Sequence, residues 1–195
     1  MSLRDLRWLA QEIEEIKLYH QRRISSLYAG QPSDEIIAIA GRMFGHYHGL
    51  AGTNNIDMLK EPDLWLDDVL SGMAEHANES ADRVTFKPLV IEIDPLVVHY
   101  IDALFGARVY IHGGQVWSDE LEYDLDELQM PDLSSSTLFQ DSANLVRKAV
   151  KVSQGHLFVT TPVLSCAINV GINIFGECLR IKVLPLISKN YHQKQ

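Results

Sequence analysis

The stretch DRVTFKPLVIEIDPLVVHYIDALFGARVYIHGGQVW, from Asp82 to Trp117, decides the fold expected for this chain. Residues 84–93 are mostly apolar and rich in branched side chains, which predicts a strand buried on both faces of a parallel sheet. A short helix is expected over residues 96–104, and another strand over residues 108–112, which a Gly-Gly pair closes. This order of strand, helix and strand indicates an α/β architecture.

The same alternation continues on both sides of this stretch. Apolar residues recur at steps of three and four over residues 3–28, 62–78 and 137–153, which predicts three helices. Short apolar runs at 35–40 and 156–161 predict further strands, and residues 169–184 begin another helix. Helices that alternate with strands are typical of a parallel sheet. We therefore expect a single domain over residues 1–195, with an N-terminal helix within residues 1–30.

Composition excludes several functional classes. The chain has 195 residues, of which 46% are hydrophobic, and its formal net charge of -9 argues against nucleic-acid binding. The N-terminus is charged throughout and therefore does not resemble a signal peptide, and no apolar run reaches membrane-spanning length. Two cysteines, Cys166 and Cys178, lie in apolar settings and do not form a disulfide framework. These features favour a cytoplasmic protein that acts on a small-molecule substrate, without a nucleic-acid or membrane partner.

Polar side chains follow the strand expected over residues 84–93. Glu92 and Asp94 bracket its end, and His99 follows one turn into the next helix. Because parallel sheets and barrels carry their chemistry at the carboxyl ends of strands, Glu92 and His99 are candidate catalytic residues. Glu92 is a candidate for proton transfer, since an apolar setting raises the pKa of a carboxyl group. The alternatives are that Asp94 caps the following helix, which is favoured for that residue, and that His99 is a packing residue.

The loop over residues 41–55 is the best candidate for substrate binding. It follows the first expected strand and is rich in glycine, histidine and asparagine. Its candidate ligands for a substrate are Arg42, His46, His48 and Asn55. A His-x-His pair without a third ligand does not define a metal site, so no metal ligands are assigned. The alternative is an ordinary glycine-rich connection whose histidines form local hydrogen bonds.

A second candidate substrate contact lies at the Gly113-Gly114 turn. Here the glycines would allow a ligand to approach the backbone beside His112, and Trp117 would stack on it. The alternative, which we favour modestly, is a tight turn with a tryptophan in the core.

Several short motifs in the sequence resemble those of a known protein family. They are residues 86–92 (FKPLVIE), 105–108 (FGAR), 113–117 (GGQVW), 124–128 (DLDEL), 161–163 (TPV) and 175–177 (FGE). Together they resemble the uroporphyrinogen decarboxylase superfamily of (β/α)8 TIM barrels, which includes corrinoid-dependent methyltransferases. The resemblance spans residues 30–179 and implies the first three strand–helix units of such a barrel. It also implies either decarboxylation of a carboxylated substrate or methyl transfer with a corrinoid partner.

Two departures from the family pattern bear on the chemistry. Lys87 and Pro88 follow Phe86 where the decarboxylases have a catalytic aspartate, and only Gly41-Arg42 resembles their arginine-rich loop. These departures favour the methyltransferase branch. That branch builds its zinc site mainly from later barrel strands, so no cofactor is identifiable in this chain. Zinc or a corrinoid partner is expected only of a full-length parent.

Length leads to a further expectation. A (β/α)8 barrel needs about 250 residues, which predicts that this chain is the N-terminal part of one, with residues 178–195 as a truncated or divergent tail. An open barrel edge would then be covered by self-association or by a second half-barrel chain. The alternative function is a catalytically inactive fragment, or an interaction half that needs a second chain.

Overall fold

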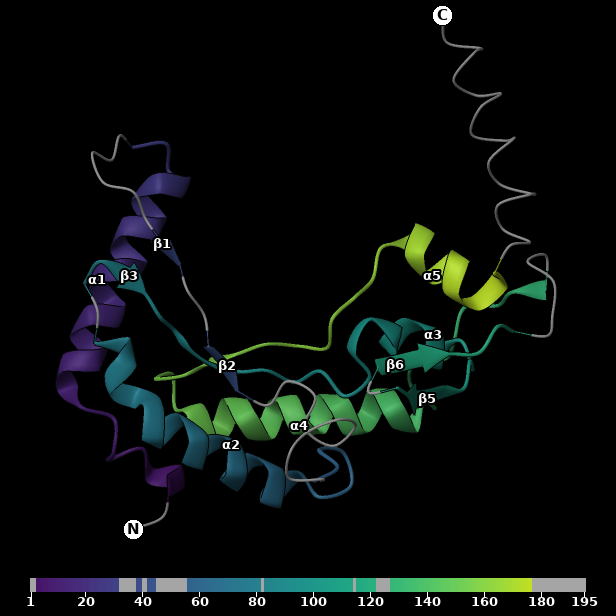
Figure 1. Ribbon diagram of the computed structural model, residues 1–195, viewed down its shortest axis with the longest axis horizontal. Coiled ribbons are helices and arrows are strands. Elements are labelled where there is room, and N and C mark those ends of the chain that lie inside the picture. The colour runs from purple at the N-terminus through teal and green to yellow at the C-terminus, as the bar shows by residue number, and fades with distance from the viewer. Residues whose placement is uncertain are drawn as a thin grey trace, which may run out of the picture. The chain divides into compact units, whose positions relative to one another are not determined.

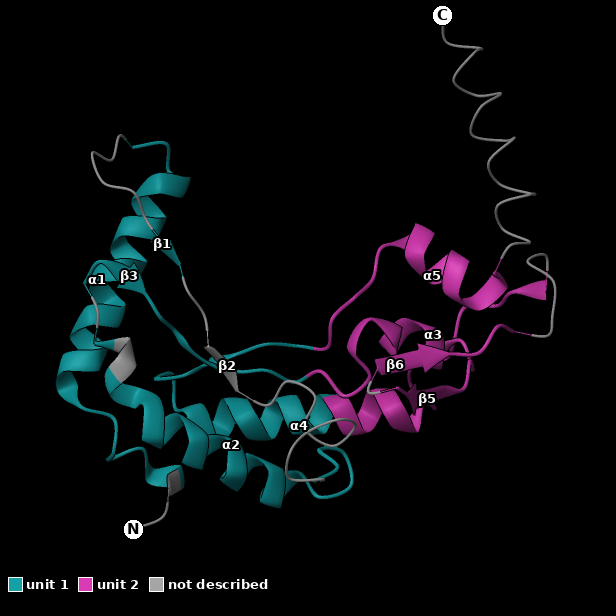
Figure 2. Cartoon of the chain, in the orientation of Figure 1, with its two compact units in different colours: residues 1–93, 143–161 teal, residues 94–142, 162–195 magenta. Residues whose placement is uncertain are grey.

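The computed structural model describes residues 3–31, 38–39, 42–44, 56–81, 83–113, 115–121 and 127–176. The chain divides into two compact units, which Figure 2 distinguishes by colour. Unit 1 comprises residues 1–93 and 143–161, and unit 2 comprises residues 94–142 and 162–195. Each unit mixes helix and strand, in agreement with the expected α/β class (Figure 1). The single domain over residues 1–195 stays a prediction.

Two segments of unit 1 run side by side in parallel. β1 (Ala38–Ile39) pairs with β3 (Thr85–Phe86), and β2 (Arg42–Phe44) pairs with β4 (Leu89–Ile91). Both pairings have the same offset of 47 residues along the sequence, from 38 to 85 and from 42 to 89. The strand expected over residues 84–93 therefore keeps one register, but it is interrupted at Pro88, because proline has no N–H to donate to a ladder.

A third strand completes the sheet around β4. β7 (Phe158–Val159) pairs with β4 in parallel, so the strand order is β2-β4-β7. The parallel pairing expected from the alternation of helices and strands is thus confirmed in unit 1. This sheet has three short strands, and no closed barrel is formed by the described residues.

The helices of unit 1 begin and end close to the expected positions, with one exception. They are η1 (Leu3–Asp5), α1 (Gln11–Tyr28), α2 (Pro62–His76), η2 (Ala77–Ser80) and most of α4 (Thr137–Ser153). The single helix expected over residues 3–28 is wrong, because Leu6 has a φ of 55°. A left-handed residue cannot continue a right-handed helix, so α1 starts only at Gln11.

The core of unit 1 forms where the apolar face of α2 meets β4 and α4. Trp65 on α2 is fully buried, as are Ile91 on β4 and Ala149 on α4. The same cluster contains Leu66, Val69, Leu70, Met73, Ala77, Leu89, Ile93, Leu145 and Leu157. Side chains at steps of three and four along α2 share one face, which explains why the periodicity of the sequence locates this core.

Unit 2 is built around a hairpin and short helices. η3 (Val97–His99) leads directly into α3 (Tyr100–Leu104), and β5 (Val109–His112) pairs with β6 (Gln115–Ser118). α5 (Ala167–Phe175) packs against α3, and its Val170, Ile174 and Phe175 form an apolar cluster with Ala107. No helix among the described residues combines the length and the apolar character that a membrane span requires.

The hairpin corrects one expectation. The strand over residues 108–112 was expected to join a parallel sheet, whereas β5 is antiparallel to β6. Gly113 adopts a φ of 60° and lets the chain reverse directly after β5. The nearest available partner is therefore the segment that follows in the sequence.

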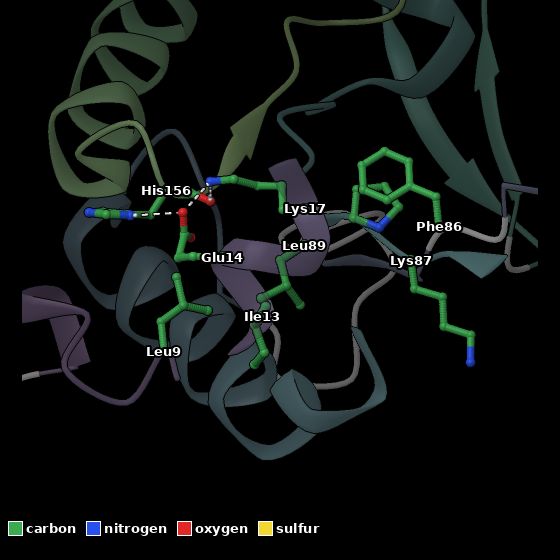
Figure 3. A pocket seen from close by; sticks show the side chains of 9 residues that line it. Leu9, Ile13, Glu14, Lys17, Phe86, Lys87, Leu89 and His156 are labelled. Atoms are coloured by element: carbon green, nitrogen blue, oxygen red, sulfur yellow. Dashed lines mark hydrogen bonds and ion pairs between the residues drawn. The ribbon is translucent and has the colours of Figure 1, made fainter. Parts of the chain in front are cut away.

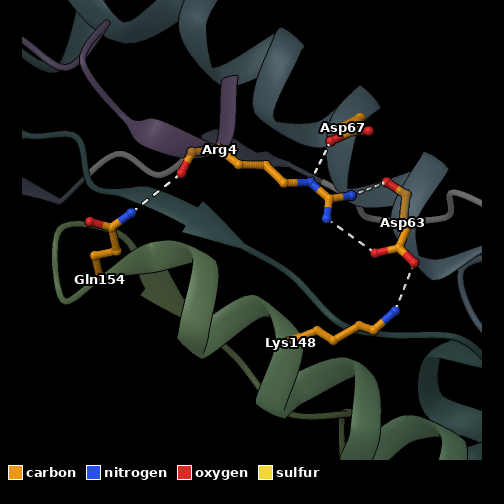
Figure 4. A network of polar contacts seen from close by, with 5 residues as sticks. All are labelled: Arg4, Asp63, Asp67, Lys148 and Gln154. Carbon is orange, nitrogen blue, oxygen red and sulfur yellow. Dashed lines mark hydrogen bonds and ion pairs between the residues drawn. The ribbon is translucent and has the colours of Figure 1, made fainter. Parts of the chain in front are cut away.

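A network of charged side chains ties three helices of unit 1 together (Figure 4). Arg4 Nε lies 2.7 Å from Asp67 Oδ1, and Arg4 Nη1 lies 3.1 Å from Asp63 Oδ1. The Nζ of Lys148 lies 2.8 Å from Asp63 Oδ2, and Gln154 Nε2 donates to the carbonyl of Arg4 at 3.3 Å. Asp63 thus bridges η1 and α4 from its place on α2.

This network predicts a small loss of stability at neutral pH when Asp63 is replaced by asparagine. Lys148 and then Arg4 hold the pKa of Asp63 below its ordinary value of 3.8. A carboxyl whose pKa is lowered by folding contributes stability above its unfolded pKa, and this contribution is lost as pH falls through the folded pKa. The melting temperature of Asp63→Asn should therefore fall below that of the parent at pH 7, and the two should converge at the lowest pH values.

The effect should be modest and salt-dependent, because the network is solvent-exposed. Glu75→Gln, on the same helix, is the matched control and should leave the melting temperature unchanged. Equal pH dependence of the Asp63 variant and the parent would contradict the assignment.

Candidate functional site

Glu92 lies where the sequence placed it, directly after the central strand of the parallel sheet. It is 6% exposed. Beside it, the backbone N–H of Ile93 donates to Thr160 Oγ1 at 3.3 Å, and the N–H of Thr160 donates to the carbonyl of Ile91 at 3.0 Å. The carboxyl ends of β4 and β7 are therefore held together at Glu92, at the edge where parallel sheets position chemistry. Its catalytic role stays a prediction.

Asp94 begins unit 2 and does not cap a helix, so that expectation is wrong. The N-cap position of η3 is Leu96, which makes no side-chain cap. The carboxylate of Asp94 is buried and accepts a hydrogen bond from the backbone N–H of Val163 at 3.4 Å. Asp94 therefore joins its own segment to the one that leads into α5.

A buried polar cluster surrounds His99 in unit 2. The Nδ1 of His99 lies 2.7 Å from Asp102 Oδ2. The same oxygen accepts a hydrogen bond from Ser118 Oγ at 3.1 Å and from Asn173 Nδ2 at 2.9 Å. Asn173 Nδ2 also lies 3.4 Å from His99 Nδ1. Three side chains thus converge on one carboxylate oxygen of Asp102, and we call these four residues the His99 cluster.

Four elements bring the His99 cluster together. His99 ends η3 and Asp102 lies three residues later in α3, a spacing that places two side chains on one helical face. Ser118 ends β6, which lies against η3, and Asn173 projects from α5, which packs on α3. Because each contact comes from a different element, the cluster exists only in the folded unit.

The carboxylate of Asp102 makes the His99 cluster costly to bury. Asp102 is 0% exposed, and its Oδ1 is buried with no hydrogen-bond partner among the described residues. A buried carboxylate that is only partly satisfied is unfavourable relative to an apolar side chain. The imidazole of His99 retains 12% exposure, and within the described part of the chain its Nε2 forms no hydrogen bond. A histidine oriented by a buried carboxylate, with its second nitrogen unengaged, is suited to proton transfer.

Tyr100 lies beside His99 in the sequence but does not serve as a base. Burial raises the pKa of its phenol above the ordinary value of 10.0, and a hydrogen bond with Ser142 offsets part of that rise. The phenol therefore stays protonated at neutral pH.

Asp102, Ser118 and Asn173 were not among the residues predicted for the site. The pairing of Asp102 with His99 could have been predicted from the sequence, since a spacing of three residues follows the helical repeat. Asn173 could also have been singled out, because it is a polar residue in the mostly apolar helix AINVGINIF, four residues after Asn169. No local sequence pattern pointed to Ser118, because its contact with Asp102 depends on formation of the hairpin.

The loop candidates are only partly described. Arg42 lies in β2, where its backbone pairs with Leu89, and its side chain is outside the described residues. His46, His48 and Asn55 also lie outside them. Their proposed contacts with a substrate therefore stay predictions.

His112 and Trp117 meet across the hairpin. The Nε1 of Trp117 donates to the carbonyl of His112 at 3.2 Å. The alternative of a core tryptophan is wrong, because Trp117 is 47% exposed. Its indole is held by the hairpin and remains accessible for stacking.

A small pocket in unit 1 belongs to the scaffold (Figure 3). Glu14 Oε2 lies 2.8 Å from Lys17 Nζ and 3.3 Å from His156 Nδ1, while Lys17 donates to the carbonyl of His156 at 2.9 Å. The pocket encloses about 10 Å³, the space of about one water molecule. Leu89 and His156, which line it, lie at the amino ends of β4 and β7. That end of a parallel sheet serves stability rather than chemistry.

Comparison with known proteins adds no relative from which to transfer a role. No protein-family model, curated protein or solved structure matches this sequence. Within the described ranges, no three histidine, cysteine or acidic side chains are grouped closely enough to hold a metal ion.

Proposed function

We propose that this chain carries the first strand–helix units of a uroporphyrinogen decarboxylase-like barrel enzyme, and that His99 transfers protons in its reaction. The observation that carries the proposal is the 2.7 Å contact between His99 Nδ1 and the fully buried Asp102. The parallel order β2-β4-β7 supports the barrel, since consecutive strands of such a barrel lie side by side. The resemblance of the short motifs described above supports this choice of family.

The resemblance favours methyl transfer with a corrinoid partner, because Lys87-Pro88 occupies the place of the decarboxylase aspartate. In that reaction His99 Nε2 would take the proton of the methyl acceptor, whose electron pair would form the new bond to the methyl group. The bond between the methyl group and its donor would break, and its electron pair would stay with the donor. The second reaction is decarboxylation, in which the carbon–carbon bond to the carboxylate breaks and its electron pair takes a proton. There, protonated His99 or the buried carboxyl of Glu92 supplies the proton.

The remaining parts of the proposal concern partners and location. The substrate is a small molecule. Its two candidate contacts, each taken separately, are the loop over residues 41–55 and the hairpin, with the side chains predicted above. Self-association or a second half-barrel chain covers the open edges of the sheet. The protein acts in the cytoplasm, in keeping with its two dispersed cysteines.

The test is to assay the purified chain for loss of the methyl group from methylcobalamin in the presence of thiol acceptors, and for CO2 release from uroporphyrinogen. His99→Gln and Glu92→Gln should each lower the observed turnover by about 10²–10⁴-fold, the usual contribution of an acid–base group. His156→Gln and Glu75→Gln are the matched controls and should retain turnover. Both carry the same chemical change at positions away from the His99 cluster and from Glu92.

Retained turnover in His99→Gln would contradict the role of His99, and retained turnover in Glu92→Gln would contradict that of Glu92. No turnover in either assay by the parent chain would contradict the enzymatic proposal. That result would favour the interaction role.

A further inference from the structure

We infer that Asn173 and Ser118 are positioning residues that hold His99 in the tautomer with hydrogen on Nδ1, leaving Nε2 as a hydrogen-bond acceptor. The catalytic use of this arrangement rests on the proposed function. The arrangement itself is a property of the folded chain and can be measured without a substrate.

The Oδ2 atom of Asp102 is an acceptor for donors from other elements. A Ser118 hydroxyl and an Asn173 amide both donate to it, at 3.1 and 2.9 Å. An oxygen that accepts from these donors presents lone pairs to its other neighbours. His99 Nδ1, at 2.7 Å from the same oxygen, must therefore carry a hydrogen, because two lone pairs at that distance would repel.

Asn173 lies beside the imidazole of His99. The Nδ2 of Asn173 is a hydrogen-bond donor and not an acceptor. It lies 3.4 Å from His99 Nδ1 and donates to Asp102 Oδ2 at 2.9 Å. The amide therefore occupies the space next to Nδ1 and leaves the carboxylate as the acceptor for that nitrogen. Rotation of the imidazole away from Asp102 would leave a buried oxygen with one donor fewer, which is unfavourable.

The two donors to Asp102 come from elements other than its own helix. Ser118 lies on β6 and Asn173 on α5, whereas Asp102 shares a helical segment with His99. The aspartate alone has rotational freedom about its side-chain bonds, and two donors from other elements remove it. Without them, the carboxylate would be free to turn, and the imidazole would sample both tautomers.

The chain offers close controls for both positions. Asn169 lies one turn before Asn173 on α5 and is exposed, so Asn169→Ala makes the same change on the same helix without touching the cluster. At position 118, threonine keeps the hydroxyl and suits a strand, whereas alanine removes the hydroxyl.

The experiment is long-range ¹H–¹⁵N NMR of the imidazole nitrogens in the ¹⁵N-histidine-labelled full chain, with the His99 signals assigned from His99→Gln. The parent should show a protonated Nδ1 and an unprotonated Nε2. Asn173→Ala and Ser118→Ala should lose this pattern and show averaged shifts. Asn169→Ala and Ser118→Thr should keep it.

Asn173→Leu preserves the side-chain volume, and it replaces the alanine variant if that variant loses its cooperative melt. A parent chain with hydrogen on Nε2 would overturn the inference. So would an unchanged His99 signal in the folded Asn173 and Ser118 variants. Because this readout uses no substrate, its failure is distinct from an absence of methyl transfer or CO2 release, which bears on the proposed function alone.

Discussion

Trp65→Ala is expected to lower the free energy of unfolding of unit 1 by about 3–5 kcal/mol, the usual cost of truncating a buried aromatic side chain. Trp65 is 0% exposed and lies in the cluster that joins α2 to β4 and α4. Alanine would leave a cavity that the surrounding helices and strand cannot fill without moving. A loss of this size approaches the whole stability of a small domain.

The measurement is urea unfolding followed by far-UV circular dichroism, which does not depend on the fluorescence of the removed indole. Leu64→Ala is the matched control, because Leu64 is next to Trp65 on α2 and its side chain is 57% exposed. Trp65→Phe should cost less than alanine, since it keeps an aromatic ring and removes an Nε1 that is buried without a partner among the described residues. An alanine variant no less stable than Leu64→Ala would show that Trp65 is not the centre of this core.

Asp102→Asn is expected to lower the turnover of the proposed reaction by about 10²–10⁴-fold while the chain stays folded. The carboxylate oxygen of Asp102 accepts from His99, Ser118 and Asn173. An asparagine would turn its oxygen toward the donors of Ser118 and Asn173 and would still accept from His99 Nδ1, but it carries no negative charge. The positive charge that His99 gains on taking up a proton would then lose its ionic partner, without a change in the size of the side chain.

Turnover and the thermal melt should be measured on the same preparations of this variant. Asp119→Asn, an exposed position next to Ser118, is the matched control and should retain turnover. An Asp102→Asn variant with parental turnover would contradict the role of the aspartate. An equal loss in both variants would attribute the effect to the segment rather than to the carboxylate.

The candidate site illustrates how far local pattern reaches. Glu92 could be placed at the end of a buried strand because the apolar run and its polar end are adjacent in the sequence. The pairing of His99 with Asp102 was accessible in the same way from their spacing. The contribution of Asn173 was not, because it lies 71 residues from Asp102 and reaches it only through the packing of α5 on α3.

The sequence by itself determined the elements whose periodicity is strong and uninterrupted. α2, α4 and the parallel strands β4 and β7 follow from it, because burial of one helical face or of both strand faces imposes a repeat that the side chains display.

The tertiary structure decided what depends on single backbone conformations or on distant partners. The left-handed Leu6 ends a helix that the apolar pattern would continue, and Gly113 turns β5 into an antiparallel hairpin. The convergence of donors from β6 and α5 on Asp102 likewise has no local signature. Periodicity reports only which side chains are buried, whereas the partner of each buried polar group is chosen when separate elements pack together.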